Sequence, residues 1–355
     1  MAVVHGAGPP IHRTTTINAN FRPEIAVPRI RCWHSREPGL AGLELGHVAR
    51  PEPGPGEVLV RVEAAALNFS DLLMIEDGYQ VRPPRPFIPG QEIAGTVVAA
   101  GPGAGLAVGG RVTSKVLWGG FAEYAVVRAD MAMSVPADLS IAAAAALPVV
   151  YTTALVALAE TATVGSAEIV LVLAAAGGVG LASVQIARHL GARVIAAAGG
   201  ETKGRLAREH GAHQSVDYTR TGWIEEIREL TADRGVDIID DPVGGKFTGE
   251  AMRLLGWGGR LLLVGFSTGE IPKIAANRLL LRRASAHGVY WSHDRDDAML
   301  RRTAQRMDEL LRAGVIRPHL GAIREFDELP DALLALRRRE TTGKIVLAVQ
   351  GSAIQ

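Results

Sequence analysis

Residues 168–180 read EIVLVLAAAGGVG, an apolar run that passes directly into small residues. The apolar part, Ile169–Leu173, predicts a buried strand. The small residues after it predict a tight turn that opens a helix over Val179–Leu190. Another apolar stretch, Arg193–Ala197, follows that helix and predicts a second strand. A strand, a turn, a helix and a strand in this order predict that the two strands lie parallel in one sheet.

The glycine turn has the residue types that a dinucleotide phosphate needs. In the pattern G-x-G-x-x-G, Ala175 replaces the first glycine, while Gly177 and Gly180 match the other two. Small residues let a pyrophosphate approach the backbone, and the N-terminus of a helix offers free N–H groups. We therefore expect Gly177, Gly178, Val179 and Gly180 to hold a dinucleotide. The alternative is a tight strand–helix turn in a sheet that binds no nucleotide.

The end of the second strand indicates which nicotinamide cofactor binds. An NAD enzyme usually carries an acidic residue there, which binds the ribose hydroxyls. Here the strand ends in Ala198, Gly199 and Gly200, and Lys203 follows. Because Gly200 leaves room and Lys203 can neutralise a 2′-phosphate, the sequence favours NADPH. Glu201 argues the other way, and Lys203 has an alternative interpretation as a solvated residue in the first turn of a helix.

The alternation of strands and helices continues beyond this point. Further strands are predicted at 236–240 and 260–264, and further helices at 201–210 and 246–255. Alternation with short connections is typical of a parallel sheet covered by helices on both faces. The sequence therefore predicts an α/β fold with a doubly wound parallel sheet.

The chain before this alternation has a different texture. Short strands at Val58–Val62 and Ile93–Ala100 are bounded by Gly and Pro, which predicts a mainly-β domain. A last strand at Lys344–Val349 has no helix after it, so we assign the C-terminal part to this domain as well. The predicted domains are 1–29, a disordered extension; 30–150 with 291–355, the mainly-β domain; and 151–290, the cofactor domain.

Composition excludes several classes of protein. The 355 residues carry a formal net charge of +1, and no basic stripe suggests a nucleic-acid partner. No apolar run approaches the ~20 residues of a membrane span. Cys32 is the single cysteine, which excludes an internal disulfide and suits a reducing compartment. We expect a cytoplasmic protein with no membrane partner.

Short motifs spread from Ile30 to the C-terminus carry a family resemblance. They are NFSD (68–71), GYQ (78–80), PGQEIAG (89–95), GGFAEY (119–124), AAAGGVG (174–180), QIA (185–187), GA (211–212), DPVGG (241–245), GGR (258–260) and GKIVL (343–347). With these motifs the chain resembles the zinc-free quinone oxidoreductase (zeta-crystallin-like) branch of the medium-chain dehydrogenase/reductases. The resemblance implies a Rossmann cofactor domain and a GroES-like catalytic domain.

The resemblance also locates the positions where related alcohol dehydrogenases bind zinc. This chain has Asn68 and Gln91 at positions where those enzymes have Cys and His, and their other Cys falls near Val149. Catalytic zinc needs three N, S or O side chains and an open position, and this set does not supply them. Cys32 stands alone, so the four-cysteine structural zinc site has no counterpart either. We expect no metal.

The resemblance implies roles for residues outside the glycine turn. Asn68 and Tyr79 would face the nicotinamide, where Tyr79 could donate a hydrogen bond or proton to a developing oxyanion and Asn68 could orient the substrate or the carboxamide. Alternatively, Asn68 only satisfies backbone groups and Tyr79 is a wall of the cleft. Asp71 is expected to cap a helix. The further cofactor contacts implied are Thr153, Tyr218, Val264, Gly265, Phe266 and Lys344.

The predicted function is NADPH-dependent reduction of quinones or related conjugated carbonyl compounds by hydride transfer. Without a Lewis acid, acceptors that need little activation suit the site best. One alternative is an enoyl- or acryloyl-type reductase that reduces a C=C bond of an α,β-unsaturated carbonyl compound. Another is a catalytically idle NADPH-binding scaffold. The apolar segment 286–291 is a candidate pairing strand for a homodimer.

Overall fold

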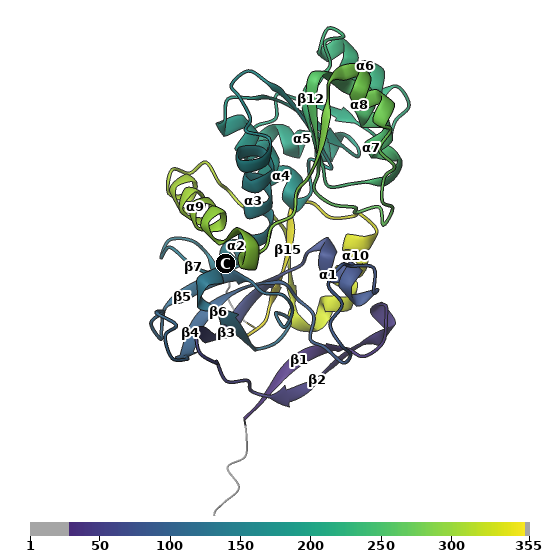
Figure 1. Cartoon of the computed structure of the whole chain (residues 1–355). Helices are drawn as coiled ribbons and strands as arrows, with labels where there is room; N and C mark the ends of the chain where they lie inside the picture. The colour runs from purple at the N-terminus through teal and green to yellow at the C-terminus, as the bar shows by residue number, and fades with distance from the viewer. Residues whose placement is uncertain (1–27, 352–355) are drawn as a thin grey trace, which may run out of the picture.

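The computed structural model describes residues 28–351. The extension predicted over residues 1–29 lies outside this range except for its last two residues. Strand β1 (Arg29–Ser35) begins at the second of them and forms an antiparallel hairpin with β2 (Leu43–Ala49). Figure 1 shows two bodies, one rich in helices and one built around a twisted sheet, with this hairpin at the far edge of the second.

The first body contains a six-stranded parallel sheet in the order β10-β9-β8-β11-β12-β13. Its strands are β8 (Ile169–Leu173), β9 (Arg193–Ala198), β10 (Gln214–Asp217), β11 (Val236–Asp241), β12 (Leu255–Leu263) and β13 (Ser285–Gly288). Its helices are α4 (Gly178–His189), α5 (Glu201–Glu209), α6 (Trp223–Leu230), α7 (Gly245–Ala251) and α8 (Ala276–Arg282). The expected doubly wound α/β fold is confirmed.

Strand β8 shows why helices cover both faces of this sheet. All its residues are buried. Val170 and Val172 belong to the core that includes α4, while Leu171 belongs to the core that includes α6. Because successive side chains of a strand point to opposite faces, an unbroken apolar run requires cover on both sides.

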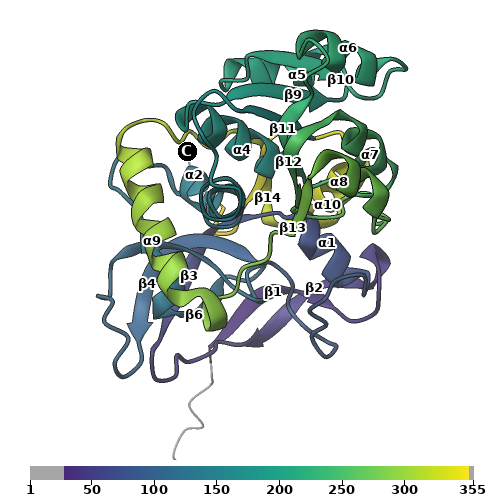
Figure 2. The same ribbon diagram turned by 45° about the horizontal axis from the view of Figure 1, so that its top comes forward.

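The second body contains a sheet in the order β14-β15-β3-β4-β5-β7, with β6 also paired to β3. Its strands are β3 (Glu57–Ala66), β4 (Glu92–Ala100), β5 (Arg111–Lys115), β6 (Tyr124–Arg128), β7 (Ala132–Ser134), β14 (Leu320–Glu325) and β15 (Lys344–Ala348). The C-terminal strand β15 pairs antiparallel with β3. Helices α1 (Phe69–Ile75) and α10 (Leu329–Arg337) lie beside each other at this body's border with the first, as Figure 1 and Figure 2 both show.

Three helices connect the two bodies. These are α2 (Ile141–Ala145), α3 (Pro148–Leu155) and α9 (His293–Arg312). Pro148 begins α3, where its missing N–H costs nothing. Helix α9 buries Leu300 and Met307 in the same core as α3 and α4. The domain limits at 150 and 290 stay a prediction. The prediction assigns α9 to the mainly-β domain, whereas its buried side chains pack in the core of the cofactor domain.

Helix length and hydropathy also bear on the expected absence of a membrane partner. Within residues 28–351, no helix combines the length and the apolar character that crossing a bilayer requires. The cytoplasmic location stays a prediction.

Candidate active site

A cleft of about 920 Å³ lies where the carboxyl ends of the parallel strands face the second sheet. Ligands of open parallel sheets bind at this edge, because the strand–helix turns gather there. The structure brings every predicted site residue to this cleft. They are Asn68, Tyr79, Thr153, Gly177, Gly178, Val179, Gly180, Gly200, Lys203, Tyr218, Val264, Gly265, Phe266 and Lys344.

The N-terminus of α4 offers unpaired backbone donors to the cleft. Gly177 is the N-cap of this helix, and no side chain caps it. The N–H groups of Gly178, Val179 and Gly180 have no acceptor among the described residues. A Cβ at position 180 would lie 2.2 Å from the carbonyl oxygen of Ala174, so only glycine lets the helix pack this closely on β8. The turn therefore fits a pyrophosphate group, which would accept these hydrogen bonds.

The end of β9 presents positive charge and no carboxylate. Gly200 has a φ of 85°, and a Cβ there would meet nothing within 4 Å. The ammonium of Lys203 donates to the carbonyl oxygen of Arg339 at 2.6 Å, and burial is the main cause that lowers the pKa of Lys203. Glu201 does not line the cleft. Its carboxylate instead accepts a hydrogen bond from the guanidinium of Arg208 at 2.8 Å. The space and charge here fit a phosphorylated ribose.

The remaining predicted cofactor contacts lie along the same edge. Tyr218 packs edge-on against Phe247, with 5.0 Å between ring centroids, and burial raises the pKa of its phenol. Val264–Phe266 follow the carboxyl end of β12, where the N–H of Val264 donates to the carbonyl oxygen of Asp241. Thr153 accepts a hydrogen bond from the indole of Trp291 at 3.2 Å. Their roles toward a cofactor stay predictions.

The opposite end of the cleft contains the side chains predicted to face the substrate. Tyr79 lines the cleft near Gln91, and burial is the main cause that raises the pKa of its phenol. Ser70 donates a short hydrogen bond to the side-chain oxygen of Gln91, so that oxygen already has a donor. Burial keeps the Tyr79 hydroxyl protonated and able to donate to a ligand in the cleft.

Lys344 has different partners from those that the resemblance implies. Its ammonium is buried and donates to the carbonyl oxygen of Leu67 at 2.7 Å, to Asn68 Oδ1 at 2.6 Å and to Glu92 Oε2 at 2.7 Å. These bonds use all three of its protons, so none remains for a pyrophosphate. Lys344 therefore acts in this structure as the counter-ion of Glu92.

Asn68 belongs to the same buried network. Its side-chain amide donates to Glu92 Oε2 at 3.0 Å, while its oxygen accepts from Lys344. The other oxygen of Glu92 accepts the backbone N–H of Val149 at 2.7 Å. The Asn68 side chain is therefore held by protein groups, and its predicted role as a direct substrate ligand has no free donor or acceptor to support it.

The residues at the family's zinc positions are chemically unsuited to that ion. Asn68 bonds the Lys344 ammonium, Gln91 bonds Ser70, and Val149 contributes only its backbone N–H. A second cation beside a fixed ammonium would also be repelled. No cluster of three His, Cys, Asp or Glu side chains able to hold a metal occurs in residues 28–351.

Three acidic residues differ in what they do. Asp71 accepts the backbone N–H of Asn68 at 2.8 Å at the start of α1, which confirms that it caps this helix. Asp241 caps the turn before α7 by accepting from Val243 at 2.8 Å and Gly244 at 3.0 Å. Asp240 neither caps a helix nor faces solvent. It is fully buried, and neither of its oxygens has a partner among the described residues.

Four residues at the cleft were not predicted as site residues. Lys115, Trp291 and Arg339 line it, and Glu92 holds Lys344 beneath it. Arg339 follows α10 with a φ of 58°, and its carbonyl oxygen accepts from Lys203. Of these four residues, only Glu92 could have been found from the sequence. It is the glutamate of the motif P-G-Q-E, and a glutamate inside a buried strand requires a cationic partner.

Comparisons with known proteins agree with this geometry. Family models match residues 54–137 (alcohol dehydrogenase GroES-like domain) and residues 178–309 (zinc-binding dehydrogenase). Quinone oxidoreductase-like protein 2 of Rattus norvegicus is 35% identical over 323 residues, which are 90% of this chain and 91% of that protein.

Solved structures give the same result. The quinone oxidoreductase of Thermus thermophilus, solved alone and with NADPH, has a TM-score of 0.78 and 35% identity, covering 90% of this chain and 100% of that one. A mycobacterial protein solved with NADPH has a TM-score of 0.85 and 30% identity, with the same coverage. The medium-chain dehydrogenase/reductases bind NAD(P), and this chain belongs to that superfamily, in its zinc-free quinone oxidoreductase branch.

Proposed function

We propose that this protein transfers a hydride from NADPH to quinones or related conjugated carbonyl acceptors, without zinc. The observation that carries the proposal is the charge of the cleft. Its described lining contains the cations Lys115, Lys203 and Arg339, together with Lys344, which is paired with the buried Glu92, and no Asp or Glu. A cleft of this sign attracts a cofactor with several phosphates.

Each part of the cleft has a role in binding the cofactor. The α4 amides would hold the pyrophosphate, while Lys203 and the space at Gly200 would accept the 2′-phosphate. Tyr218 would lie at the adenosine phosphate, and Thr153 would lie beside the nicotinamide. The backbone of 264–266 would complete that wall. When bound, the reduced nicotinamide supplies the hydride, and the protein's residues set its position.

At the acceptor end, Tyr79 offers its hydroxyl. It would donate a hydrogen bond to the oxygen on which negative charge develops, as oxyanion-stabilising groups do. Asn68, held by Lys344 and Glu92, acts as a positioning residue for the surrounding backbone. Acceptors that need no Lewis acid, such as quinones, suit this set of donors.

Turnover by the purified protein tests the proposal. With NADPH, we expect reduction of simple quinones at a higher kcat/KM than reduction of enones or enoyl thioesters, measured as loss of NADPH absorbance. Reduction of enoyl thioesters alone would favour the C=C reductase instead. Tight NADPH binding without oxidation by any of these acceptors would favour the idle scaffold. Chelators should leave the rate unchanged, and a rate restored by added zinc would contradict the metal-free reaction.

We also propose a homodimer formed through the cofactor domain. Strand β13 is the edge of the parallel sheet, and its outer side has no partner strand within residues 28–351. Trp257, Leu280 and Leu281, from the neighbouring β12 and α8, are 68%, 78% and 71% exposed. An unpaired edge beside apolar side chains is the surface on which two copies can pair. Sedimentation at micromolar concentration should give twice the chain mass, and a monomer would contradict this.

A further inference from the structure

Among the cations that line the cleft, Lys115 is the one to which the proposed binding mode assigns no group of the cofactor and no protein partner. It is the last residue of β5 and lies in the second body, far along the chain from the glycine turn. Lys344 has all its protons engaged, and Lys203 and Arg339 lie together at the end of β9. Lys115 shares its end of the cleft with Gln91 and Trp291.

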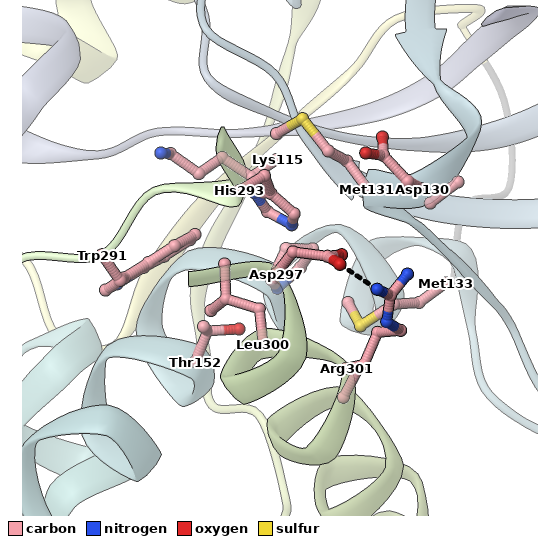
Figure 3. Close-up of a pocket in the computed structure, with 13 residues that line it drawn as sticks. Lys115, Asp130, Met131, Met133, Thr152, Trp291, His293, Asp297, Leu300 and Arg301 are labelled. Atoms are coloured by element: carbon pink, nitrogen blue, oxygen red, sulfur yellow. Dashed lines mark hydrogen bonds and ion pairs between the residues drawn. The ribbon is translucent and has the colours of Figure 1, made fainter. Parts of the chain in front are cut away.

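Trp291 holds the Lys115 side chain in place. The ammonium lies 4.3 Å from the centroid of the indole ring, within the range of a cation–π contact. The indole N–H in turn donates to Thr153 on α3. Figure 3 shows the Lys115 chain extending over Trp291, with its nitrogen pointing away from His293 and Asp297. The ammonium therefore has a defined position at the cleft.

Within residues 28–351, no group accepts a hydrogen bond from this ammonium. The described residues place no acceptor within hydrogen-bond distance of it, and it forms no ion pair. Its titratable neighbours are Glu92 and His293. The oxygens of Glu92 are already bonded to other donors, and the pKa of His293 is lowered first by burial and then by the charge of Lys115. Burial lowers the pKa of Lys115. Lys115 is half-buried. A partly desolvated ammonium without a hydrogen-bond acceptor is costly, and an anionic ligand would offset that cost.

We propose that Lys115 binds the reducible carbonyl oxygen of the acceptor and protonates it after hydride transfer. This inference rests on the proposed function. The acceptor gains a hydride, which is two electrons and a proton, and its oxygen becomes an anion. Lys115 gives one proton to that oxygen through an N–H···O contact, becomes a neutral amine and takes a proton back from water. A quinone thus leaves as the neutral hydroquinone, and an enone as its enol.

The position of Lys115 also defines the class of acceptor. Lys115 already covers a face of the buried Trp291, so the acceptor would meet the ammonium rather than stack on the indole. A conjugated carbonyl compound brings the oxygen that this ammonium would bind. Tyr79 would donate its hydrogen bond to the same developing oxyanion, and Lys115 would supply the proton.

Binding of para-nitrophenol tests the charge without turnover. Its phenolate is an oxyanion on a flat ring, and its absorption shows whether it binds ionised. In the complex with oxidised NADP⁺, the wild-type protein should bind the phenolate, and Lys115→Met should bind it at least about tenfold more weakly. Lys273→Met, at an exposed lysine outside the cleft, is the matched control and should bind as the wild type does.

Lys115→Arg separates charge from proton transfer. Its guanidinium keeps the charge but cannot release a proton, because its pKa exceeds about 12. We expect phenolate binding within a few-fold of wild type, with kcat for quinones reduced about 100-fold. Lys115→Gln replaces Lys115→Met if the latter does not fold, as circular dichroism would show.

Two results would overturn the assignment of Lys115. One is phenolate binding that is equal in wild type and Lys115→Met; the other is no phenolate binding by wild type. If phenolate binds through Lys115 but no quinone or enone oxidises NADPH, the anion site stands and the proposed function fails. The two failures are therefore distinguishable.

Discussion

The two ends of the cleft are built in different ways. At the phosphate end, one continuous segment, 174–180, supplies backbone N–H groups from a strand, a turn and the first turn of a helix. At the acceptor end, side chains from distant segments meet: Lys344 of β15 lies between Asn68 and Glu92, and Trp291 lies under Lys115. The first end depends on local backbone shape, and the second depends on long-range packing of charges.

This difference predicts how each end fails. A site formed by backbone groups tolerates most substitutions around it. It does not tolerate a Cβ added at the glycine that makes its closest contact. A buried network of charges depends on every member, because removal of one leaves another uncompensated. The predictions below test this contrast, from the largest expected effect to the smallest.

Lys344→Met should be the most damaging substitution. The Glu92 carboxylate is fully buried, and it would lose the ammonium 2.7 Å away. We expect a loss of about 3–5 kcal/mol in the free energy of unfolding, measured by urea denaturation. The double variant Lys344→Met with Glu92→Gln should recover part of this loss. A loss below about 1 kcal/mol would show that the pair is not the buried support described here.

Asp240→Asn should change how stability depends on pH. Burial raises the pKa of Asp240 from 3.8 to about 7, and it lies beside Ser183 of α4. Between these values the folded protein keeps a proton that the unfolded chain has lost. Stability should therefore fall from pH 4 to pH 7 by on the order of 3 kcal/mol and then level off.

The asparagine variant cannot ionise at this position. Its unfolding free energy should therefore not show the decrease between pH 4 and pH 7 that Asp240 causes in the wild type. Parallel curves for the wild type and Asp240→Asn across pH 4–8 would contradict the raised pKa.

Gly180→Ala tests the phosphate end directly. The new Cβ would lie 2.2 Å from the Ala174 carbonyl oxygen, so α4 must shift from β8. We expect a loss of about 2 kcal/mol in unfolding free energy and weaker NADPH binding. Gly249→Ala is the control, since a Cβ there meets nothing within 4 Å. It should leave stability equal or raise it by up to about 1 kcal/mol.

Lys203→Glu should alter the choice of cofactor more than the fold. A carboxylate at the end of β9 would repel a 2′-phosphate but not a ribose hydroxyl. The KM for NADPH should rise about tenfold or more, with a smaller change for NADH. Equal changes for both cofactors would remove the basis for preferring NADPH.

The phosphate end and the acceptor end also differ in how well the sequence predicted them. The strands β8 and β9, the helix between them and the glycine turn were predicted closely, because apolar runs and glycines act locally. The cleft position of all predicted residues followed from those elements and from the family resemblance. Helix α6 and the hairpin β1–β2 were not predicted as elements.

The acceptor end was not predictable in detail from local patterns. Lys344 is separated from Glu92 by 252 positions, and no sequence pattern indicates that they bond. Lys115 looked like an ordinary strand residue until the Trp291 ring was placed beneath it. Asp240 ends a strand in the sequence next to Asp241, and no local pattern indicates that its carboxylate is fully buried.

Calorimetric titration of the wild-type protein with NADPH and then with NADH tests the central claim most directly. A cleft with α4 amides for the pyrophosphate and Lys203 for the 2′-phosphate should bind NADPH at least about tenfold more tightly than NADH. If neither reduced nicotinamide binds the folded protein, the account of the cleft is wrong.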